Sequence, residues 1–251
     1  MSFKLIWELA KANLKSRYRN TWAGFLWVIL NPMIMFGVQS LIFKHVLKLN
    51  VDQYYIFLLS GLLPWIFLVQ SSEMSTSLFI VNGPLLKSFK MDPRVLVIAQ
   101  LMDNFINFIS VFIILFIAGI FLNDFHQFSS FLWLPFALAI LILAASGISL
   151  ILATLQVFFR DTRFIIQFLF QILFFLTPIF YPVDFIPEKY RFLVSFNPFF
   201  AIISSFRSLF INFSAETYPT YFLTGALWTL GIWVIALSFW KLKRNELILR
   251  L

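Results

Sequence analysis

The sequence predicts an all-α integral membrane protein. It has six transmembrane helices, an amphipathic N-terminal helix at the membrane interface and an extracytoplasmic re-entrant helical hairpin before the last span. Three observations predict this fold: the composition, the lengths of the apolar segments and the distribution of lysine and arginine. The chain has 251 residues, of which 61% are hydrophobic and 12% are charged. Soluble domains are about 45–50% apolar and about 25% charged, so lipid must be the solvent for much of this chain.

Residues 1–20 predict an interfacial helix. Their apolar side chains recur at helical spacing among basic ones, without the unbroken apolar core of a cleavable signal peptide. Such a helix lies in the plane of the membrane and its basic side chains reach the headgroups. A disordered basic tail is the alternative. The apolar positions are Leu5, Ile6, Leu9, Ala12 and Leu14, and the basic ones are Lys4, Lys11, Lys15, Arg17 and Arg19.

Six apolar segments are long enough to cross a bilayer. A hydrocarbon core about 30 Å thick needs about 20 residues of helix. An even number of spans places both termini on the same side, and the loops between them are too short to form a separate domain. The predicted spans are Gly24–Phe43, Tyr54–Ile80, Val95–Leu122, Phe131–Phe159, Phe164–Tyr181 and Tyr221–Trp240.

The distribution of basic residues predicts the orientation of these spans. Of the 19 lysines and arginines, fourteen fall on the side that holds both termini and five on the other. Cytoplasmic loops carry the excess of Lys and Arg, so both termini are expected in the cytoplasm. The same asymmetry accounts for the net charge of +8 without a nucleic-acid partner.

Two connecting segments depart from a simple loop pattern. Residues 182–220 are apolar, and Asn197-Pro198 is a strong start for a second short helix, Phe199–Phe213. A re-entrant hairpin is predicted there, with an amphipathic pair on the outer membrane surface as the alternative. Residues 82–94 form a basic, proline-bracketed loop of about one to two helical turns that suits docking to another protein or serves as a solvated connector.

Several kinds of chemistry are absent from the sequence. It has no phosphate-binding loop, so the chain is not expected to hydrolyse ATP. It has no cysteine, and His45 and His126 are isolated, so no catalytic, cofactor or metal site is predicted. The acids Glu73 and Asp103 lie inside predicted spans, where a structural or cavity-facing role is favoured over a proton relay.

Several segments resemble the polysaccharide-export permeases of the type-2 ATP-binding-cassette (ABC-2) exporters. The resemblance runs through the whole chain in order and includes the number of spans. It departs from the family at Met91-Asp92-Pro93-Arg94, where Phe-Pro-Arg-Glu is more common. The similar segments are residues 17–27 and 30–32 at the first span, 58–65 in the second, 82–94, 159–161, 176–187 and 196–198.

This resemblance implies a half-transporter, a single ABC-2 transmembrane domain over residues 1–251. Two copies would pair in the bacterial cytoplasmic (inner) membrane above two separate ATPase subunits, which would hold the ATP and magnesium. The substrate would be a lipid-linked O-antigen, capsular polysaccharide or teichoic acid. The ATPase would dock on the coupling loop 82–94 and beside the turn after span four, at Leu85, Leu86, Lys87, Lys90, Arg94, Arg160 and Asp161.

Aromatic residues near the outer end of span five are candidates for the substrate path. Phe180, Tyr181, Phe199 and Phe200 gather where a polymer would leave. An aromatic face complements the C–H face of a sugar ring, although packing alone also explains such residues.

Two other functions remain open. An exporter of a drug or small lipid would use the same fold. An integral membrane glycosyltransferase or acyltransferase would need an acid or histidine facing its substrate, and such groups are scarce here.

The predicted topology can be tested by cysteine labelling, because the chain has no native cysteine. In intact cells with a permeabilised outer membrane, Glu188→Cys should react with an impermeant maleimide. Lys87→Cys should react only after lysis, because the cytoplasmic membrane shields it. The reverse pattern would overturn the orientation.

Overall fold

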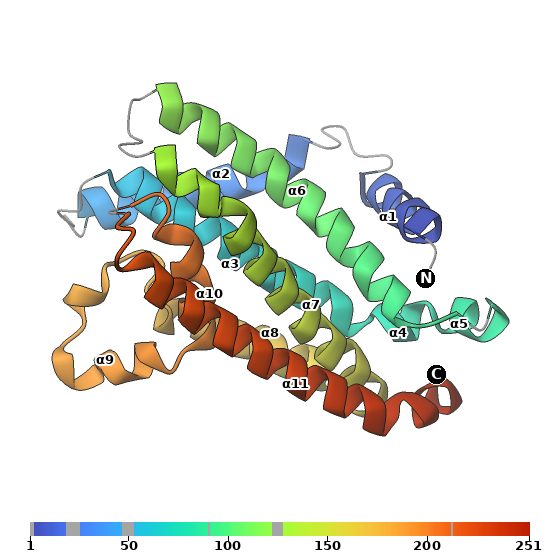
Figure 1. The fold of residues 1–251 in the computed structure, drawn as a ribbon. Coiled ribbons are helices and arrows are strands. Elements are labelled where there is room, and N and C mark those ends of the chain that lie inside the picture. The colour runs from blue at the N-terminus through green and yellow to red at the C-terminus, as the bar shows by residue number, and fades with distance from the viewer. Residues whose placement is uncertain (1–2, 19–25, 47–52, 90, 122–127, 212) are drawn as a thin grey trace.

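The computed structural model describes residues 3–18, 26–46, 53–89, 91–121, 128–211 and 213–251. Within these ranges the regular structure is entirely helical, which confirms the all-α prediction. The long helices lie alongside one another, with α5 and the C-terminus at one end of the molecule and α9 at the other (Figure 1). Of the sequence predictions, those on Arg19, Gly24, Lys90, Leu122 and His126 lie outside the described residues.

The elements follow one another with short connections. α2 continues directly into a π-helical turn, η1, and η2 and η3 are 3₁₀ turns. The bounds are α1 Phe3–Tyr18, α2 Leu26–Ser40, η1 Leu41–Val46, α3 Tyr54–Thr76, α4 Leu78–Val81, α5 Gly83–Phe89, α6 Arg94–Phe121, η2 Phe128–Trp133, α7 Leu134–Phe158, α8 Thr162–Leu176, η3 Val183–Phe185, α9 Glu188–Ser195, α10 Pro198–Arg207 and α11 Tyr218–Arg250.

Four helical segments among the described residues are long and apolar enough to cross a membrane: Tyr54–Thr76, Arg94–Ile114, Ser129–Phe158 and Tyr218–Arg250. Two further apolar helices, Ile29–Phe43 and Thr162–Leu176, are shorter. All six overlap predicted spans, although Tyr218–Arg250 extends beyond the predicted Tyr221–Trp240.

The helix of the fifth predicted span ends at Leu176 rather than Tyr181. Thr177 has an extended backbone, with φ −94° and ψ 124°, because it precedes Pro178 and proline disfavours helical geometry in the residue before it. At 15 residues, α8 is about 22 Å long. The predicted end of this helix was therefore wrong by about a turn.

α3 is the central helix of the bundle. It packs against α2, α6, α7, α8 and α10, and most of its side chains are buried. Small residues allow close approach elsewhere, as is common between membrane helices. Gly147 of α7 faces Ile232 of α11, and Trp233 donates a hydrogen bond to the Leu143 carbonyl at 2.8 Å.

α10 lies inside the bundle, where it packs against α3, α7 and α11. Its predicted start is confirmed, because the Asn197 side chain accepts hydrogen bonds from the backbone N–H groups of Phe199 and Phe200, at 2.9 Å and 3.3 Å. The helix ends at Arg207, earlier than the predicted Phe213. α9, by contrast, is largely exposed.

Arg207 connects the end of α10 to the segment that follows α8 through hydrogen bonds. Its buried guanidinium donates hydrogen bonds to the carbonyls of Pro178 and Ile179, at 2.7 Å and 2.8 Å, and lies 4.2 Å from the centre of the Phe57 ring. Gly61 of α3 makes room for it, since a Cβ there would lie 1.8 Å from the Arg207 guanidinium.

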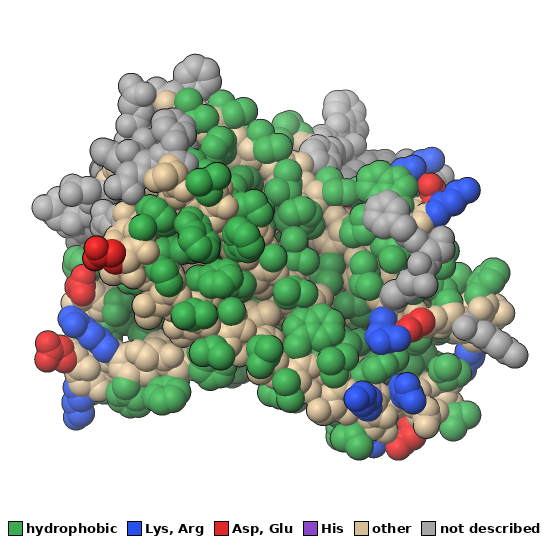
Figure 2. All heavy atoms as spheres, in the orientation of Figure 1, with side chains coloured by type: hydrophobic (Ala, Val, Ile, Leu, Met, Phe, Trp, Pro, Cys, Tyr) green, Lys and Arg blue, Asp and Glu red, His purple; other side chains and the backbone are tan. Residues whose placement is uncertain are grey.

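The surface is divided in the way that a bilayer requires. Figure 2 shows charged side chains gathered at the two ends of the molecule, with hydrophobic side chains covering most of the face between them. A broad apolar surface of this kind is stable when lipid covers it.

The packing of Gly61 against Arg207 gives a stability prediction. Gly61→Ala should destabilise the protein by about 1–3 kcal/mol, the usual cost of forcing an atom into a packed site. It should be measured as a lower midpoint of thermal unfolding in detergent. Gly231→Ala is the matched control, because a Cβ at Gly231 meets nothing within 4 Å. If both variants unfold at the wild-type temperature, Arg207 is not held against α3 in this way.

Candidate functional site

The helix α5 combines a buried anchor with an exposed tip. Leu86 is 1% exposed and belongs to the main core, Leu85 is partly buried, and Lys87 projects into solvent. Phe89, at the end of the helix, is 73% exposed. The predicted contact residues therefore divide into an inward leucine that holds the helix and outward residues that are free to meet a partner.

Arg94 is engaged within its own loop. Its guanidinium pairs with the Asp92 carboxylate, with Nε–Oδ2 at 2.9 Å, and lies 5.8 Å from the centre of the Trp240 ring. Burial alone would raise the pKa of Asp92, but hydrogen bonds from Arg94 outweigh it and lower the pKa of that carboxyl. The pair therefore stays ionised and fixes the turn that enters α6.

A hydrogen-bonded clamp shapes the turn between α7 and α8. The Gln156 side chain donates to the Arg160 carbonyl at 2.7 Å and accepts from the Arg163 backbone N–H at 2.8 Å. Arg160 and Asp161 are exposed on this turn. Phe159 is exposed beside them.

The α7–α8 turn and α5 lie at the same end of the molecule, together with the end of α11. Lys243 and Arg250 of α11 lie 5.1 Å and 4.8 Å from the centre of the Phe158 ring, and Leu251 lies against Gly83. Figure 1 shows α5 and the C-terminus side by side. We call α5, residues 159–161 and the end of α11 the coupling surface, after the ATPase contact that the sequence predicts there. Sequence reasoning did not single out Phe89, although its apolar ring in a basic loop was a visible signal.

The predicted path aromatics form part of a ring cluster at the other end of α3. Phe180 is 2% exposed, stacks on Phe43 at 5.0 Å and meets Phe174 edge-on at 4.6 Å. Phe199 packs on Trp65 at 5.6 Å. Within this single chain, Phe180 is therefore a packing residue.

Tyr181, Phe199 and Phe200 are all more accessible than Phe180. Tyr181 and Phe200 are both partly exposed, and the Tyr181 hydroxyl donates to the Phe175 carbonyl at 3.0 Å.

A polar network crosses the apolar bundle around Asp103. This carboxylate is fully buried in α6, and its Oδ2 accepts hydrogen bonds from Arg17 at 2.5 Å and Gln100 at 3.3 Å. Arg17 also donates to the Asn104 amide oxygen at 3.1 Å, and Asn104 donates to the Ser71 hydroxyl at 3.2 Å. Sequence analysis gave Asp103 a structural or cavity-facing role but did not identify its partner, because the two lie 86 positions apart.

The network ties α1 to the bundle. α1 packs along α6, with Ile6 against Val95 and Ala99, and Arg17 near its end supplies the compensating charge for Asp103. An unpaired charge at this depth would be costly. α1 is therefore fixed to α6 by both apolar packing and an ion pair.

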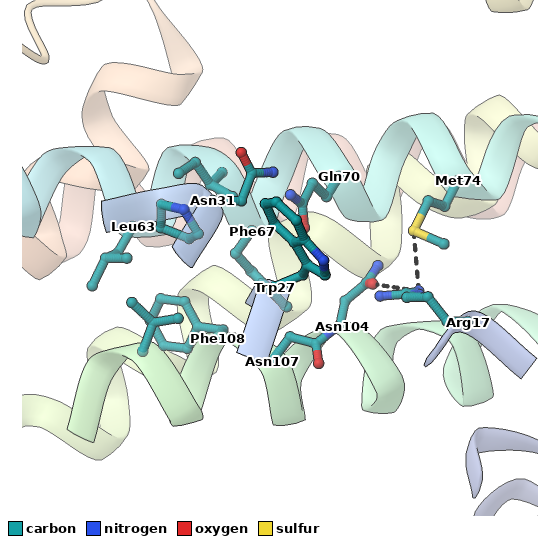
Figure 3. Close-up of a pocket in the computed structure, with 13 residues that line it drawn as sticks. Arg17, Trp27, Asn31, Leu63, Phe67, Gln70, Met74, Asn104, Asn107 and Phe108 are labelled. Atoms are coloured by element: carbon teal, nitrogen blue, oxygen red, sulfur yellow. Dashed lines mark hydrogen bonds between the residues drawn. The ribbon is translucent and has the colours of Figure 1, made fainter. Parts of the chain in front are cut away.

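A cavity of about 460 Å³ opens beside this network, between the end of α1 and helices α2, α3 and α6. Figure 3 shows Trp27 and Asn31 of α2 across from Gln70 of α3, with Arg17 and Asn104 at one end and Leu63 and Phe108 at the other. The cavity wall consists of Arg17, Trp27, Asn31, Pro32, Leu63, Ile66, Phe67, Gln70, Met74, Asn104, Asn107, Phe108 and Val111.

The second intramembrane acid faces a different cavity. Glu73 of α3 lines a space of about 450 Å³ together with Asn82, Arg163 and Gln167, near the coupling surface. Across the described part of the chain, no three His, Cys, Asp or Glu residues come together in a way that would hold a metal ion.

A helical domain with charged ends and a broad apolar face between them is typical of a multi-pass membrane protein. The chain belongs to the ABC-2 type transporter family, whose pattern matches residues 4–211. Sequence similarity also places it in the polysaccharide-export branch, which confirms the resemblance found in the sequence.

Three relatives illustrate this similarity. An "O-antigen export system permease protein RfbA" of Klebsiella pneumoniae is 31% identical over 91% of this chain and 89% of its own length. A protein of the same name from Myxococcus xanthus is 27% identical over 96% of this chain and 93% of its own length. The "Polysialic acid transport protein KpsM" of Escherichia coli is 22% identical over 94% of this chain and 92% of its own length. The similarity therefore spans almost the whole of each protein.

Breaking the Arg17–Asp103 pair should lower the free energy of unfolding only when one of the two charged partners remains. Arg17→Leu should destabilise the protein by about 3 kcal/mol, at the lower end for a broken buried pair because the orphaned carboxylate can take up a proton. Arg17→Leu with Asp103→Leu should recover most of the loss, as read by thermal unfolding in detergent.

The control for this pair is Lys11→Leu, which removes the cation of the exposed 3.2 Å pair with Glu8 on the same helix. It should change stability by less than about 1 kcal/mol. A double variant as unstable as Arg17→Leu alone would show that Arg17 acts through packing and not through charge compensation.

Proposed function

We propose that this chain is the transmembrane subunit of an ABC exporter that moves a lipid-linked polysaccharide across the bacterial inner membrane. The observation that carries the proposal is the end-to-end similarity to O-antigen export permeases. The similarity to a polysialic acid transport protein supports a polymer over a drug or small lipid as the substrate. An O-antigen, a capsular polysaccharide or a teichoic acid would each suit this class.

The proposed arrangement has six spans and both termini in the cytoplasm. α2 with η1 and α8 with residues 177–181 supply the two shorter spans, and the excess of basic residues supports the orientation. Residues 1–251 form one ABC-2 domain, with residues 1–20 as the interfacial helix and residues 182–220 as an outer re-entrant hairpin. The buried position of α10 supports the hairpin.

The proposed exporter is a homodimer with two copies of an ATPase subunit, which bind the ATP and magnesium. This chain is not the enzyme, since it has no phosphate-binding loop. The ATPase docks on the coupling surface, at Leu85, Lys87 and Arg160–Asp161, while Leu86 and Arg94 hold the surface in shape. The sequence prediction adds Lys90, which follows α5 in the chain. ATP then drives export only if the nucleotide-bound ATPase binds one permease state more tightly than another.

The proposed path for the polymer passes the aromatic residues at the outer end of α8. Tyr181, Phe199 and Phe200 are accessible enough to stack on sugar rings. Phe180 is buried and packs against Phe174 and Phe43.

Deletion of the permease tests the proposed function. Loss of the chain should leave finished lipid-linked polymer on the inner face of the cytoplasmic membrane, measured by polymer-specific lectin or antibody staining before and after permeabilisation. Normal surface polymer would contradict export. Complete absence of polymer inside and outside would indicate synthesis, as expected of a glycosyltransferase.

The exposed tip of α5 gives a prediction for coupling. Phe89→Asp should reduce co-purification of the ATPase at least about tenfold, because it replaces an apolar contact with a charge that must be desolvated in the interface. Membrane insertion should be unchanged, since Phe89 is 73% exposed.

Phe196→Asp is the matched control, because Phe196 is 72% exposed near α9 at the other end of the molecule. It should leave ATPase binding intact. Equal loss in both variants, or in neither, would remove α5 from the proposed interface.

A further inference from the structure

The cavity beside Glu73 holds two opposite charges that do not neutralise each other by direct contact. Glu73 of α3 and Arg163 of α8 line the same space of about 450 Å³, and their charges interact across it. Neither side chain belongs to an ion pair among the described residues. An ion without a close partner is costly inside a membrane protein. The cavity therefore offers a carboxylate and a guanidinium to a ligand that carries both charges itself.

Amide side chains add to the polar wall of this cavity. Asn13 of α1 and Gln167 of α8 both line it. Gln167 and Arg163 lie four positions apart, so they share one face of α8. An amide can donate a hydrogen bond to a phosphate oxygen and accept one from an ammonium group. The wall can therefore bind both the negative and the positive part of a zwitterion.

Exposed apolar residues lie beside the polar wall. Met74 and Val81 line the cavity and are 37% and 71% exposed. Phe164 and Phe168, each of which directly follows a cavity residue in α8, are 70% and 66% exposed. Apolar surface of this kind needs a cover of lipid or protein. A polar head bound in the cavity would therefore have an apolar surface next to it for attached hydrocarbon chains.

The cavity lies where the apolar bundle meets one charged end of the molecule. Glu73 is in the last turn of α3, Arg163 is in the first turn of α8, and α4 leads from the cavity to α5 (Figure 1). In the proposed orientation, on which the choice of leaflet rests, this end faces the cytoplasm. The cavity is then at the level of the headgroups of the cytoplasmic leaflet.

The charges of the cavity select a particular class of lipid. A purely anionic headgroup would meet the carboxylate of Glu73, and a cation alone would meet Arg163. A phosphoethanolamine group carries a phosphate and an ammonium, and the ammonium has N–H groups that a carboxylate can accept. A quaternary choline has no such donor and is typically bound by aromatic rings, and no aromatic side chain among the described residues lines this cavity.

We propose that this cavity binds the headgroup of a phosphatidylethanolamine molecule from the cytoplasmic leaflet. The ammonium group lies on Glu73, the phosphate lies on Arg163, and the acyl chains follow the exposed apolar surface. The volume of about 450 Å³ is within the range of about 300–1,000 Å³ that is usual for small-molecule sites. This ligand is a resident lipid of the bilayer, which connects α3 to α8 beside the coupling surface, and is separate from the transported molecule.

Native mass spectrometry of the purified full chain in detergent tests the site. The probes are dioleoyl phosphatidylethanolamine, dioleoyl phosphatidylcholine and dioleoyl phosphatidylglycerol, and the measured quantity is the dissociation constant of the first bound lipid. Phosphatidylethanolamine should bind at least about tenfold more tightly than the other two, the effect of one hydrogen bond between charged groups. Soluble phosphoethanolamine should not displace it at equal concentration, because it has no chains to bury.

Two variants separate the roles of the charges. Glu73→Gln should weaken phosphatidylethanolamine binding about tenfold and abolish its preference, without weakening phosphatidylglycerol binding. Arg163→Gln should weaken all three lipids, because each carries a phosphate. The matched controls are Glu188→Gln and Lys189→Gln, which remove exposed charges from α9 at the other end of the molecule and should keep the wild-type preference. Size-exclusion chromatography checks that each variant is folded.

Equal affinity of the wild type for the three lipids would overturn the site. So would an unchanged preference in folded Glu73→Gln, an equal loss in the α9 controls, or displacement by soluble phosphoethanolamine at equal concentration. Lipid binding is read on the purified chain and polymer location is read in the deletion strain. Failure of this site therefore leaves the proposed export function in place, and failure of export leaves the lipid site in place.

Discussion

The carboxylate of Asp103 sets a constraint that much of the bundle satisfies. It is fully buried in an apolar helix, where an unpaired charge would be strongly unfavourable. Arg17 of α1 compensates this charge. The neighbouring Asn104 donates a hydrogen bond to the Ser71 hydroxyl of α3, and the Ser149 hydroxyl of α7 donates to the Ser71 carbonyl at 3.1 Å. One charge thereby fixes four helices relative to one another, and it makes α1 an integral part of the bundle.

Arg207 has the corresponding role at the other end of α3. Its guanidinium lies over Gly61 and donates one hydrogen bond to each of the carbonyls of Pro178 and Ile179. Those carbonyls are left without helical partners because the Thr177-Pro178 sequence ends α8. The arginine therefore connects the end of α8, the buried helix α10 and the central helix α3. A small shift of α3 relative to α8 would therefore change the contacts of Arg207 with Pro178 and Ile179.

The central helix links the two ends of the molecule. α3 leads through α4 into α5 at the coupling surface, and its Trp65 belongs to the aromatic cluster that holds Phe199. Close-packed interiors transmit displacements because few voids absorb them. The cavity beside Arg17 lies along this same helix. α3 therefore gives α5 a continuous packed connection to the cavity and to the aromatic cluster, as the proposed coupling of ATPase motion to export would require.

The sequence by itself determined the helical class, the positions of the apolar segments, the Asn197-Pro198 helix start and the membership of the permease family. These depend on local signals, namely hydrophobic length, capping chemistry and short motifs. Only the tertiary structure decided that Arg17 compensates Asp103, that Arg207 lies over Gly61 and that Leu86 and Phe180 are buried. Each of these depends on contacts between residues far apart in the chain. Apolar periodicity carries little information on which face of a helix is buried when every face is apolar.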